Sequence, residues 1–215
     1  MYDLSQPLAD GIQTYPGDPE VDITAAADFE TDGYRVTAVR LGSHAGTHID
    51  APAHTEVDGN TLGAFPIHRF EMDTMCIDCQ DLGPRDRIPP DRVPDVDADA
   101  VAFHTGWDDH WGAQAYYDHP FLAQETAEKC VNRGLDVALD TLSPDPTPSP
   151  NACEDEPEGF KIHHELLGNE CLVIENLRGL DQLPETFALR VYPLALDGDG
   201  APVRAVAATT EHCIV

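Results

Sequence analysis

The segment 43–54 combines metal-ligating side chains at a regular spacing. Three imidazoles and one carboxylate occur here, on His44, His48, Asp50 and His54, at intervals of 4, 2 and 4 residues. Successive side chains of an extended chain point to opposite faces. Because all three intervals are even, an extended segment would carry the four groups on one face and the small or apolar residues between them on the other.

A helix explains this spacing poorly. Helical geometry would rotate Asp50 by about 200° from His48. Gly46 and Pro52 are also unfavourable inside a helix. We therefore predict an extended segment that presents imidazole and carboxylate groups to a cavity.

Imidazole nitrogen and carboxylate oxygen together are the donors that Zn²⁺ and Mn²⁺ accept in proteins. Gly46 would allow the backbone to approach closely where a side chain would intrude. The alternative is a histidine-rich strand with solvated rings. If buried without a cation, however, three imidazoles and a carboxylate would repel one another or lack partners. The segment therefore predicts a metal site with one or two Zn²⁺ ions, or with Mn²⁺ as the alternative.

A second group of possible ligands lies downstream, at His163, His164 and Glu175. Glu175 follows the apolar run 171–174, so we expect it at the end of a buried strand, where a carboxylate needs a cation or hydrogen-bond donors. The alternative is a Glu that caps the strand or forms a salt bridge. Both interpretations stay open from the residues alone.

These motifs resemble the cyclase family of metal-dependent hydrolases, whose best-defined members are bacterial kynurenine formamidases. The most specific family pattern, HxGTHxDxPxH, is present without a departure as HAGTHIDAPAH. The resemblance spans nearly the whole chain. Further matching pieces are DLSQPL, YPGDP at 15–19, HTGW at 104–107, ALDTLSPDP, IENL at 174–177 and GAPVRAVA at 200–207.

The resemblance implies a ligand role for five residues. His44, His48 and Asp50 match the ligands of a first metal ion, with Asp50 in the position that bridges to a second ion. His163 matches the imidazole ligand of the second ion because it precedes Glu175, the other bridging carboxylate, by the family's twelve residues. His164 would be a neighbour with less weight as a ligand.

The resemblance also assigns two residues to the reaction. His54 matches the residue that donates and accepts the catalytic proton, and Tyr15 occupies a position where formamidases usually carry an aromatic residue against the substrate, commonly Trp. The Tyr at this position leaves the substrate open, although a phenol can still stack on an aniline ring.

The expected chemistry is hydrolysis without a covalent intermediate. A metal ion lowers the pKa of water from 15.7 to about 7, and neither GxSxG nor a cysteine in a catalytic setting is present. The leading interpretation is an arylformamidase that hydrolyses N-formyl-L-kynurenine to L-kynurenine and formate in tryptophan degradation. A hydrolase of cyclic amides such as isatin, or another cyclase-family hydrolase, is the first alternative. A non-catalytic metal-binding scaffold is the second, and His54 argues against it because a scaffold needs only ligands.

The chain is strongly and evenly acidic. It carries 12 Lys and Arg residues against 40 Asp and Glu residues, a formal net charge of −28, with acidic residues spread from Asp3 to Glu211. Such a field repels phosphate backbones and anionic lipids, so we expect neither a nucleic-acid partner nor a membrane partner. The pattern indicates adaptation to high salt, where screening removes the self-repulsion. An ordinary acidic mesophilic protein is the alternative.

The first residues, MYDLSQPLADGIQ, contain neither a basic start nor the apolar run of a signal peptide, so we expect a cytoplasmic protein. Six cysteines are too few for a disulfide scaffold, and we interpret the pair Cys76 and Cys79 as structural, on a short apolar strand. By resemblance we expect a homodimer or larger homo-oligomer that acts on a small aromatic amide.

The segments between these motifs predict one α/β domain over residues 1–215, with a mixed β-sheet and flanking helices. The resemblance implies the swivelling β/α/β fold of the cyclase family. Short apolar or β-branched runs predict strands, and one segment between Pro120 and Gly134 predicts a helix. The predicted strands are 21–25, 34–41, 100–103, 137–139, 171–174, 188–194 and 203–208, and the predicted helix is 121–133.

Residues 142–159 are the richest in chain breakers, with four prolines within seven residues. Loops of this length are usually functional or mobile, and Ser143 is placed to border the pocket, although a plain turn is the alternative. A linker between two domains is a further alternative, but the residues that follow resemble the completion of one core.

Overall fold

One nine-stranded mixed sheet organises the part of the chain that the computed structural model describes, residues 1–209. Its four middle strands are parallel and the flanking pairs are antiparallel. In spatial order the strands are β1 (Tyr2–Asp3), β13 (Val206–Ala208), β11 (Thr186–Arg190), β5 (Glu71–Asp78), β7 (Ala100–His104), β9 (Asp136–Leu139), β10 (Val173–Glu175), β4 (His48–Asp50) and β12 (Gly200–Pro202).

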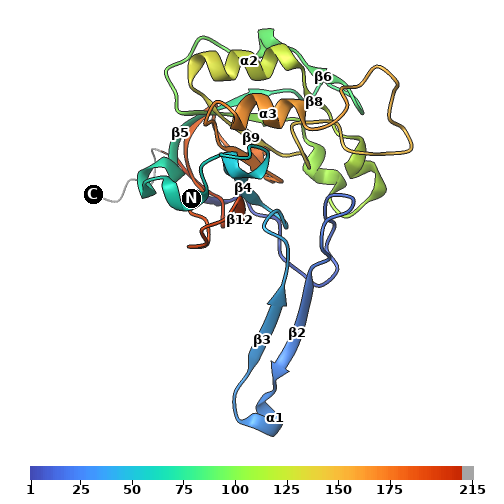
Figure 1. Cartoon of the computed structure of the whole chain (residues 1–215), viewed down its shortest axis with the longest axis vertical. Helices are drawn as coiled ribbons and strands as arrows, with labels where there is room; N and C mark the ends of the chain where they lie inside the picture. Colours follow the sequence, from blue (N-terminus) through green and yellow to red (C-terminus); the bar gives the residue numbers. More distant parts are fainter. Residues whose placement is uncertain (210–215) are drawn as a thin grey trace.

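Two helices, α2 (Gln124–Arg133) and α3 (Lys161–Leu167), lie together over one face of this sheet (Figure 1). The alternation of side chains along β7 divides the interior into two cores. Val101 and Phe103 belong to the core that contains the apolar side chains of α2 and α3, whereas Ala100 and Ala102 belong to the core on the other face. The predicted α/β domain with a mixed sheet and flanking helices is therefore confirmed.

The sheet is strongly curled. β12 lies at one end of the strand order and β13 lies next to the other end, yet only residues 203–205 connect them. Such a link spans at most about 14 Å, so the two ends of the sheet must approach each other. The bridge between Pro193, which follows β11, and Val203, which follows β12, joins the two sides, as does the bridge between Ser5, which follows β1, and Leu177, which follows β10.

A long hairpin extends away from this body (Figure 1). It consists of β2 (Asp22–Ala27) and β3 (Val36–Arg40), with α1 (Phe29–Asp32) at its tip. Every residue of β3 is exposed, including apolar Val36 and Val39. We refer to residues 22–40 as the arm.

Short elements complete the fold. The parallel pair β6 (Arg87–Ile88) and β8 (Phe121–Leu122) lies apart from the main sheet. The longest helix in residues 1–209 is α2, whose ten residues are too few to cross a bilayer. Single-turn or slightly longer 3-10 helices occur at Pro52–His54, Leu62–Ala64, Ile67–Phe70, Pro90–Arg92, Trp107–His110, Gln114–Asp118 and Leu180–Gln182.

The sequence predicted the end of α2 correctly and its start incorrectly. Gly134 terminates the helix with a left-handed φ of 67°. The predicted first residues, Phe121 and Leu122, instead form β8, because the backbone N–H of Leu122 donates to Pro144 O and that of Phe121 donates to Asp86 O. A pairing with distant residues thus overrides the local helical pattern.

Other predicted strands also need correction. The run 203–208 is not one strand, since residues 203–205 connect β12 to β13 around the curl and only residues 206–208 form β13. The run 188–194 stays in the sheet only as far as Arg190, and the runs 21–25 and 34–41 form the arm rather than part of the main sheet. Cys76 lies on β5 and Cys79 directly after it, both as free thiols, and burial raises the pKa of Cys79 to about 12.

The proline-rich segment does not join two domains, because strands before and after it share one sheet. Residues 210–215, including Glu211, lie outside the described residues.

Candidate metal centre

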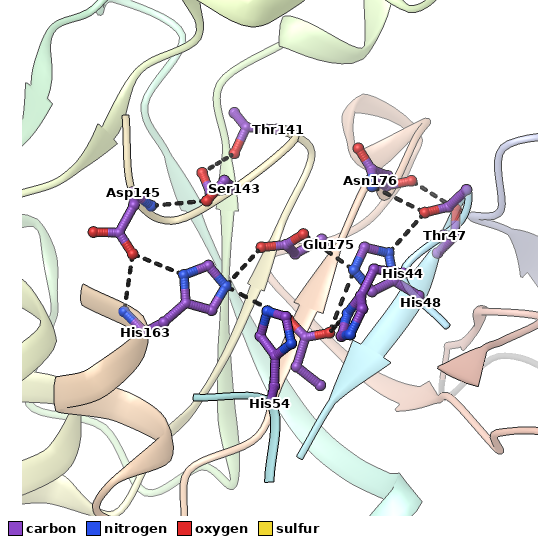
Figure 2. A network of polar contacts seen from close by, with 12 residues as sticks. His44, Thr47, His48, His54, Thr141, Ser143, Asp145, His163, Glu175 and Asn176 are labelled. Carbon is purple, nitrogen blue, oxygen red and sulfur yellow. Dashed lines mark hydrogen bonds and ion pairs between the residues drawn. The ribbon is translucent and has the colours of Figure 1, made fainter. Parts of the chain in front are cut away.

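The centre is built on two neighbouring antiparallel strands, β4 and β10. His48 and Glu175 are directly opposed in the register, so their side chains leave the same face of the sheet. Asp50, two residues after His48, shares that face. The helix α3 covers this face, and its buried His163 points its ring toward Glu175 (Figure 2).

Among residues 1–209, two groups whose donor atoms lie within 4.8 Å of one another share Asp50, namely His44–His48–Asp50 and Asp50–His163–Glu175, and a third, His44–His54–Asp199, adjoins the first. In the first group, Nδ1 of His44 lies 2.7 Å and Nε2 of His48 lies 3.3 Å from Oδ1 of Asp50. In the second, Nε2 of His163 lies 3.3 Å from Oε1 of Glu175 and 3.7 Å from Oδ2 of Asp50. Asp50 belongs to both of these groups.

Three buried atoms in these groups lack hydrogen-bond partners among residues 1–209: Nε2 of His48, Oδ2 of Asp50 and Oε1 of Glu175. Unpartnered polar atoms are costly in a protein interior. Divalent cations held in the two groups would give these atoms partners, because an imidazole nitrogen and carboxylate oxygens are the ligands that such ions accept. The donor set therefore fits a metal ion.

The electrostatics of the centre point the same way. Burial alone would raise the pKa of Asp50, but His48 and His44 hold it well below its usual value. Burial alone would lower the pKa of His163, but the hydrogen bond to Asp145 and the nearby carboxylates of Asp50 and Glu175 reverse the direction and raise it well above its usual value. Two buried carboxylates thus favour positive charge on the surrounding imidazoles, and a cation would replace those protons.

Local turns bring the first four residues together, and the prediction of a fully extended segment was wrong. Only β4 is extended. The chain bends before it at Gly46, which has a φ of 65°, and turns after it in the 3-10 helix that begins at Pro52. These turns place the rings of His44 and His54 with centroids 3.9 Å apart. The four side chains therefore come together because the chain turns before and after β4, not because they line one face of a straight strand.

His54 lies at the rim of the centre, with its side chain 26% exposed. Burial lowers its pKa, and the neighbouring His44 adds to that effect while Asp50 opposes it. Its Nδ1 lies 3.6 Å from Oδ2 of Asp199, which also contacts Nε2 of His44 at 2.9 Å. His54 therefore sits beside the donor groups as a neutral imidazole at neutral pH.

A small cavity of about 60 Å³ opens onto the donor groups. Tyr15 and Phe160 form its aromatic side, with ring centroids 5.8 Å apart, and Ser143 borders it as expected. Burial raises the pKa of Tyr15 to about 12, so the phenol is neutral. The exposed side chain of His164 points away from the donor groups, and its Nδ1 lies 2.7 Å from Oε1 of Glu56. This position agrees with its lower weight as a ligand.

Sequence reasoning missed several residues around the centre. Asp18 and Asp199 lie within motifs that the sequence displayed, YPGDP and the residues just before GAPVRAVA, but neither was assigned a role. Asp145 also lies within a displayed motif, ALDTLSPDP, without an assigned role, whereas Phe160 carried no local signal because its place depends on how residues 142–159 fold back.

Comparison with known proteins places the chain in a family. The family model described as "Putative cyclase" matches residues 2–146. A kynurenine formamidase from Bacillus cytotoxicus is 31% identical over 210 residues, covering 95% of each chain. The chain belongs to the cyclase family. The resemblance inferred from HAGTHIDAPAH is therefore confirmed, as is the expectation of a hydrolytic enzyme.

Solved structures agree with membership of the cyclase family. Isatin hydrolase A from Ralstonia solanacearum has a TM-score of 0.81 and 23% identity, with 96% of this chain and 90% of that chain covered, which establishes a common fold. A structure described as a "Potential Metal-Dependent Hydrolase With Cyclase Activity" has a TM-score of 0.76 and 26% identity, with 96% of both chains covered. The predicted cyclase-like fold is thus confirmed.

Proposed function

We propose that this cyclase-family hydrolase binds one or two divalent ions and hydrolyses the C–N bond of N-formyl-L-kynurenine, giving L-kynurenine and formate. The observation that carries the proposal is the convergence of two donor groups on Asp50 beneath one cavity. The likeness to a kynurenine formamidase over 95% of both chains supports the choice of substrate.

The ions would be held by residues from separate elements. His44, His48 and Asp50 would hold the first, and His163 and Glu175 would hold the second together with Asp50. Zn²⁺ is the expected ion and Mn²⁺ the alternative, since imidazole and carboxylate donors suit both. A divalent ion bound there supplies Lewis acidity, which lowers the pKa of water and polarises the amide carbonyl.

His54 would move the proton. Its lowered pKa leaves the imidazole neutral at pH 7, so it can accept a proton from the attacking water. It can then donate that proton to the departing nitrogen, because the amine is a poor leaving group unless protonated. The position of His54 at the rim, beside the donor groups but in neither of the two that share Asp50, suits this role.

Tyr15 and Phe160 would orient the substrate. Their rings form an apolar, aromatic side of the cavity, where an aniline ring can pack by offset or edge contacts. Such packing would hold the formamide carbonyl over the donor groups. The same aromatic side would also accept a fused lactam such as isatin, so cyclic-amide hydrolysis is the competing activity.

A substrate panel tests the proposal. Purified protein loaded with Zn²⁺ or Mn²⁺ is assayed for formate release from N-formyl-L-kynurenine and for ring opening of isatin and simpler lactams. We expect turnover of the formamide and little turnover of the lactams. Ring opening without formate release would instead identify a cyclic-amide hydrolase, and ion binding without turnover of any amide would indicate a scaffold.

The homodimer and the cytoplasmic location implied by the family resemblance belong to the same proposal. The exposed apolar side chains of the arm offer a surface that a second copy would cover, because an isolated two-stranded hairpin is only marginally stable in water. Light scattering coupled to size-exclusion chromatography in concentrated KCl tests the dimer. A monomeric mass at micromolar concentration would reject it.

A further inference from the structure

The proline-rich segment 142–159 contains a carboxylate, on Asp145, that contacts the side of the His163 ring facing away from Asp50 and Glu175. Asp145 is 1% exposed, and it accepts three hydrogen bonds from the start of α3. Its Oδ1 accepts from the backbone N–H of Ile162 at 2.9 Å. Its Oδ2 accepts from the backbone N–H of His163 at 2.9 Å and lies 2.7 Å from Nδ1 of the same residue (Figure 2).

These contacts determine which ring nitrogen of His163 faces the carboxylates of Glu175 and Asp50. A carboxylate can only accept, so the hydrogen on the ring belongs on Nδ1. When a cation displaces the second ring proton, the other nitrogen, Nε2, carries the lone pair, and it points toward Glu175 and Asp50, at 3.3 and 3.7 Å. A cation needs that lone pair, because a protonated nitrogen cannot ligate.

We propose that Asp145 is a positioning residue that fixes the tautomer and orientation of His163 and thereby sets the affinity of the Asp50–His163–Glu175 group for a divalent ion. This inference rests on the proposed metal centre, and it gives the proline-rich segment a function. The two backbone N–H groups hold the carboxylate in place, so the ring is aligned before any ion arrives.

The chemistry requires Asp rather than Asn at this position. An amide in the same place can accept at its oxygen from a backbone N–H, but its nitrogen donates. Directed at Nδ1, it would favour the tautomer with the hydrogen on Nε2, where the hydrogen would block the cation. In the opposite orientation the amide oxygen could still accept from His163, but the NH2 group would then face the backbone N–H of Ile162. In either orientation Asp145→Asn preserves size, removes the negative charge behind the ring and sets two hydrogen-bond donors against each other.

The competing explanation is that Asp145 only anchors its segment. Asp118 provides the matched control, because it anchors the same segment without contacting His163. Its carboxylate accepts from Nδ2 of Asn151 at 2.7 Å and from the hydroxyl of Ser149, and it lies 3.5 Å from Nη1 of Arg85. A purely anchoring role predicts that Asp145→Asn and Asp118→Asn behave alike.

Titration calorimetry with Zn²⁺ on chelator-stripped protein separates the two explanations. Outer-sphere partners of ligating imidazoles typically contribute 10- to 100-fold in metal affinity. We expect Asp145→Asn to weaken ion binding by that factor at one site, and to leave the affinity of the His44–His48–Asp50 group unchanged if two ions bind. Asp118→Asn should lower the melting temperature of the stripped protein without changing any dissociation constant.

A second variant covers the case in which Asp145→Asn fails to fold. Ser at position 145 can still accept a backbone N–H at the start of α3, but it offers no second oxygen to the ring, so Asp145→Ser should show the same weakened site. Unchanged affinities in the folded variants would overturn the inference. Absence of ion binding by the wild-type protein would instead reject the metal centre itself.

Discussion

His48 on β4 and Glu175 on β10 are directly opposed partners in an antiparallel pair, with Nε2 and Oε2 3.1 Å apart. The backbone ladder therefore fixes the separation of two donors that lie 127 positions apart in the chain. Asp50 is carried by the same strand as His48, and His163 by the helix that covers this face. Donors held by regular elements are positioned before an ion binds, so little ordering is needed at that moment.

The proton-transfer role of His54 predicts a separation of metal binding from turnover. The variant His54→Ala should keep the ion content of the wild-type protein while kcat falls by about 100-fold or more, the usual contribution of a general acid or base. His68→Ala, an exposed histidine on the 3-10 helix Ile67–Phe70, is the control and should leave kcat unchanged. Wild-type turnover by His54→Ala, or loss of its bound ions, would contradict this assignment.

The close approach of Gly200 to His44 predicts a steric effect on ion binding. A Cβ at Gly200 would lie 2.6 Å from Cε1 of His44 and 3.1 Å from its Nδ1, so Gly200→Ala must displace the ring. A displaced donor should weaken the His44–His48–Asp50 group, measured as a lower Zn²⁺ affinity by calorimetry. Gly198→Ala is the matched control, because its Cβ would meet only ordinary contacts at 3.5 Å. Equal affinities for the two variants would show that His44 contributes no donor.

Buried His119 predicts an acid-sensitive element of stability. Burial lowers its pKa to about 4. Its Nδ1 lies 2.8 Å from Pro120 O and its Nε2 lies 2.7 Å from Oγ1 of Thr147. The unfolded chain, with a His pKa of about 6.5, binds this proton more readily than the folded protein. The contribution of His119 is therefore complete above pH 6.5 and is lost as the pH falls toward 4, in total about 3 kcal/mol.

Denaturant unfolding between pH 7 and pH 4 measures this contribution. The variant His119→Gln should show a shallower fall in the free energy of unfolding across that window than the wild-type protein, at the same KCl concentration. Parallel curves for the two proteins would mean that His119 does not titrate differently in the folded and unfolded states.

The net charge of −28 predicts that salt stabilises the fold. At 1 M salt the screening length is about 3 Å, which removes most of the repulsion between the exposed carboxylates. The melting temperature should therefore rise steeply with KCl and respond much less to sucrose, which does not screen charge. A flat KCl series would favour the alternative of an ordinary acidic mesophilic protein.

The sequence was informative where the relevant residues are local. His44, His48, Asp50 and His54 occur within one short motif, and Glu175 ends an apolar run, so their types and spacing indicated a centre before any fold was known. Gly134 marked the end of α2 for the same reason, because a left-handed residue stops a helix through its own backbone.

Contacts between distant segments explain what the sequence did not predict. Asp199 meets His44 across 155 positions, and Asp145 meets His163 only because the proline-rich segment folds back onto α3. The separation of β13 (206–208) from β12 (200–202) by the link 203–205 follows from the closure of the curled sheet, which no local pattern encodes. The bend at Gly46 was missed because the even spacing of the ligand residues favours a straight strand. A short strand with a turn on each side brings the same side chains together, and the spacing does not distinguish the two.

The central claim is that His44, His48, Asp50, His163 and Glu175 hold divalent ions on which hydrolysis depends. The most direct test measures the bound ions and formate release from N-formyl-L-kynurenine on the same samples, before chelation, after chelation and after addition of Zn²⁺ or Mn²⁺. We predict one or two ions per chain, loss of activity in proportion to the ions removed, and recovery on reloading. Full activity in thoroughly chelated protein with no detectable ions would contradict the account.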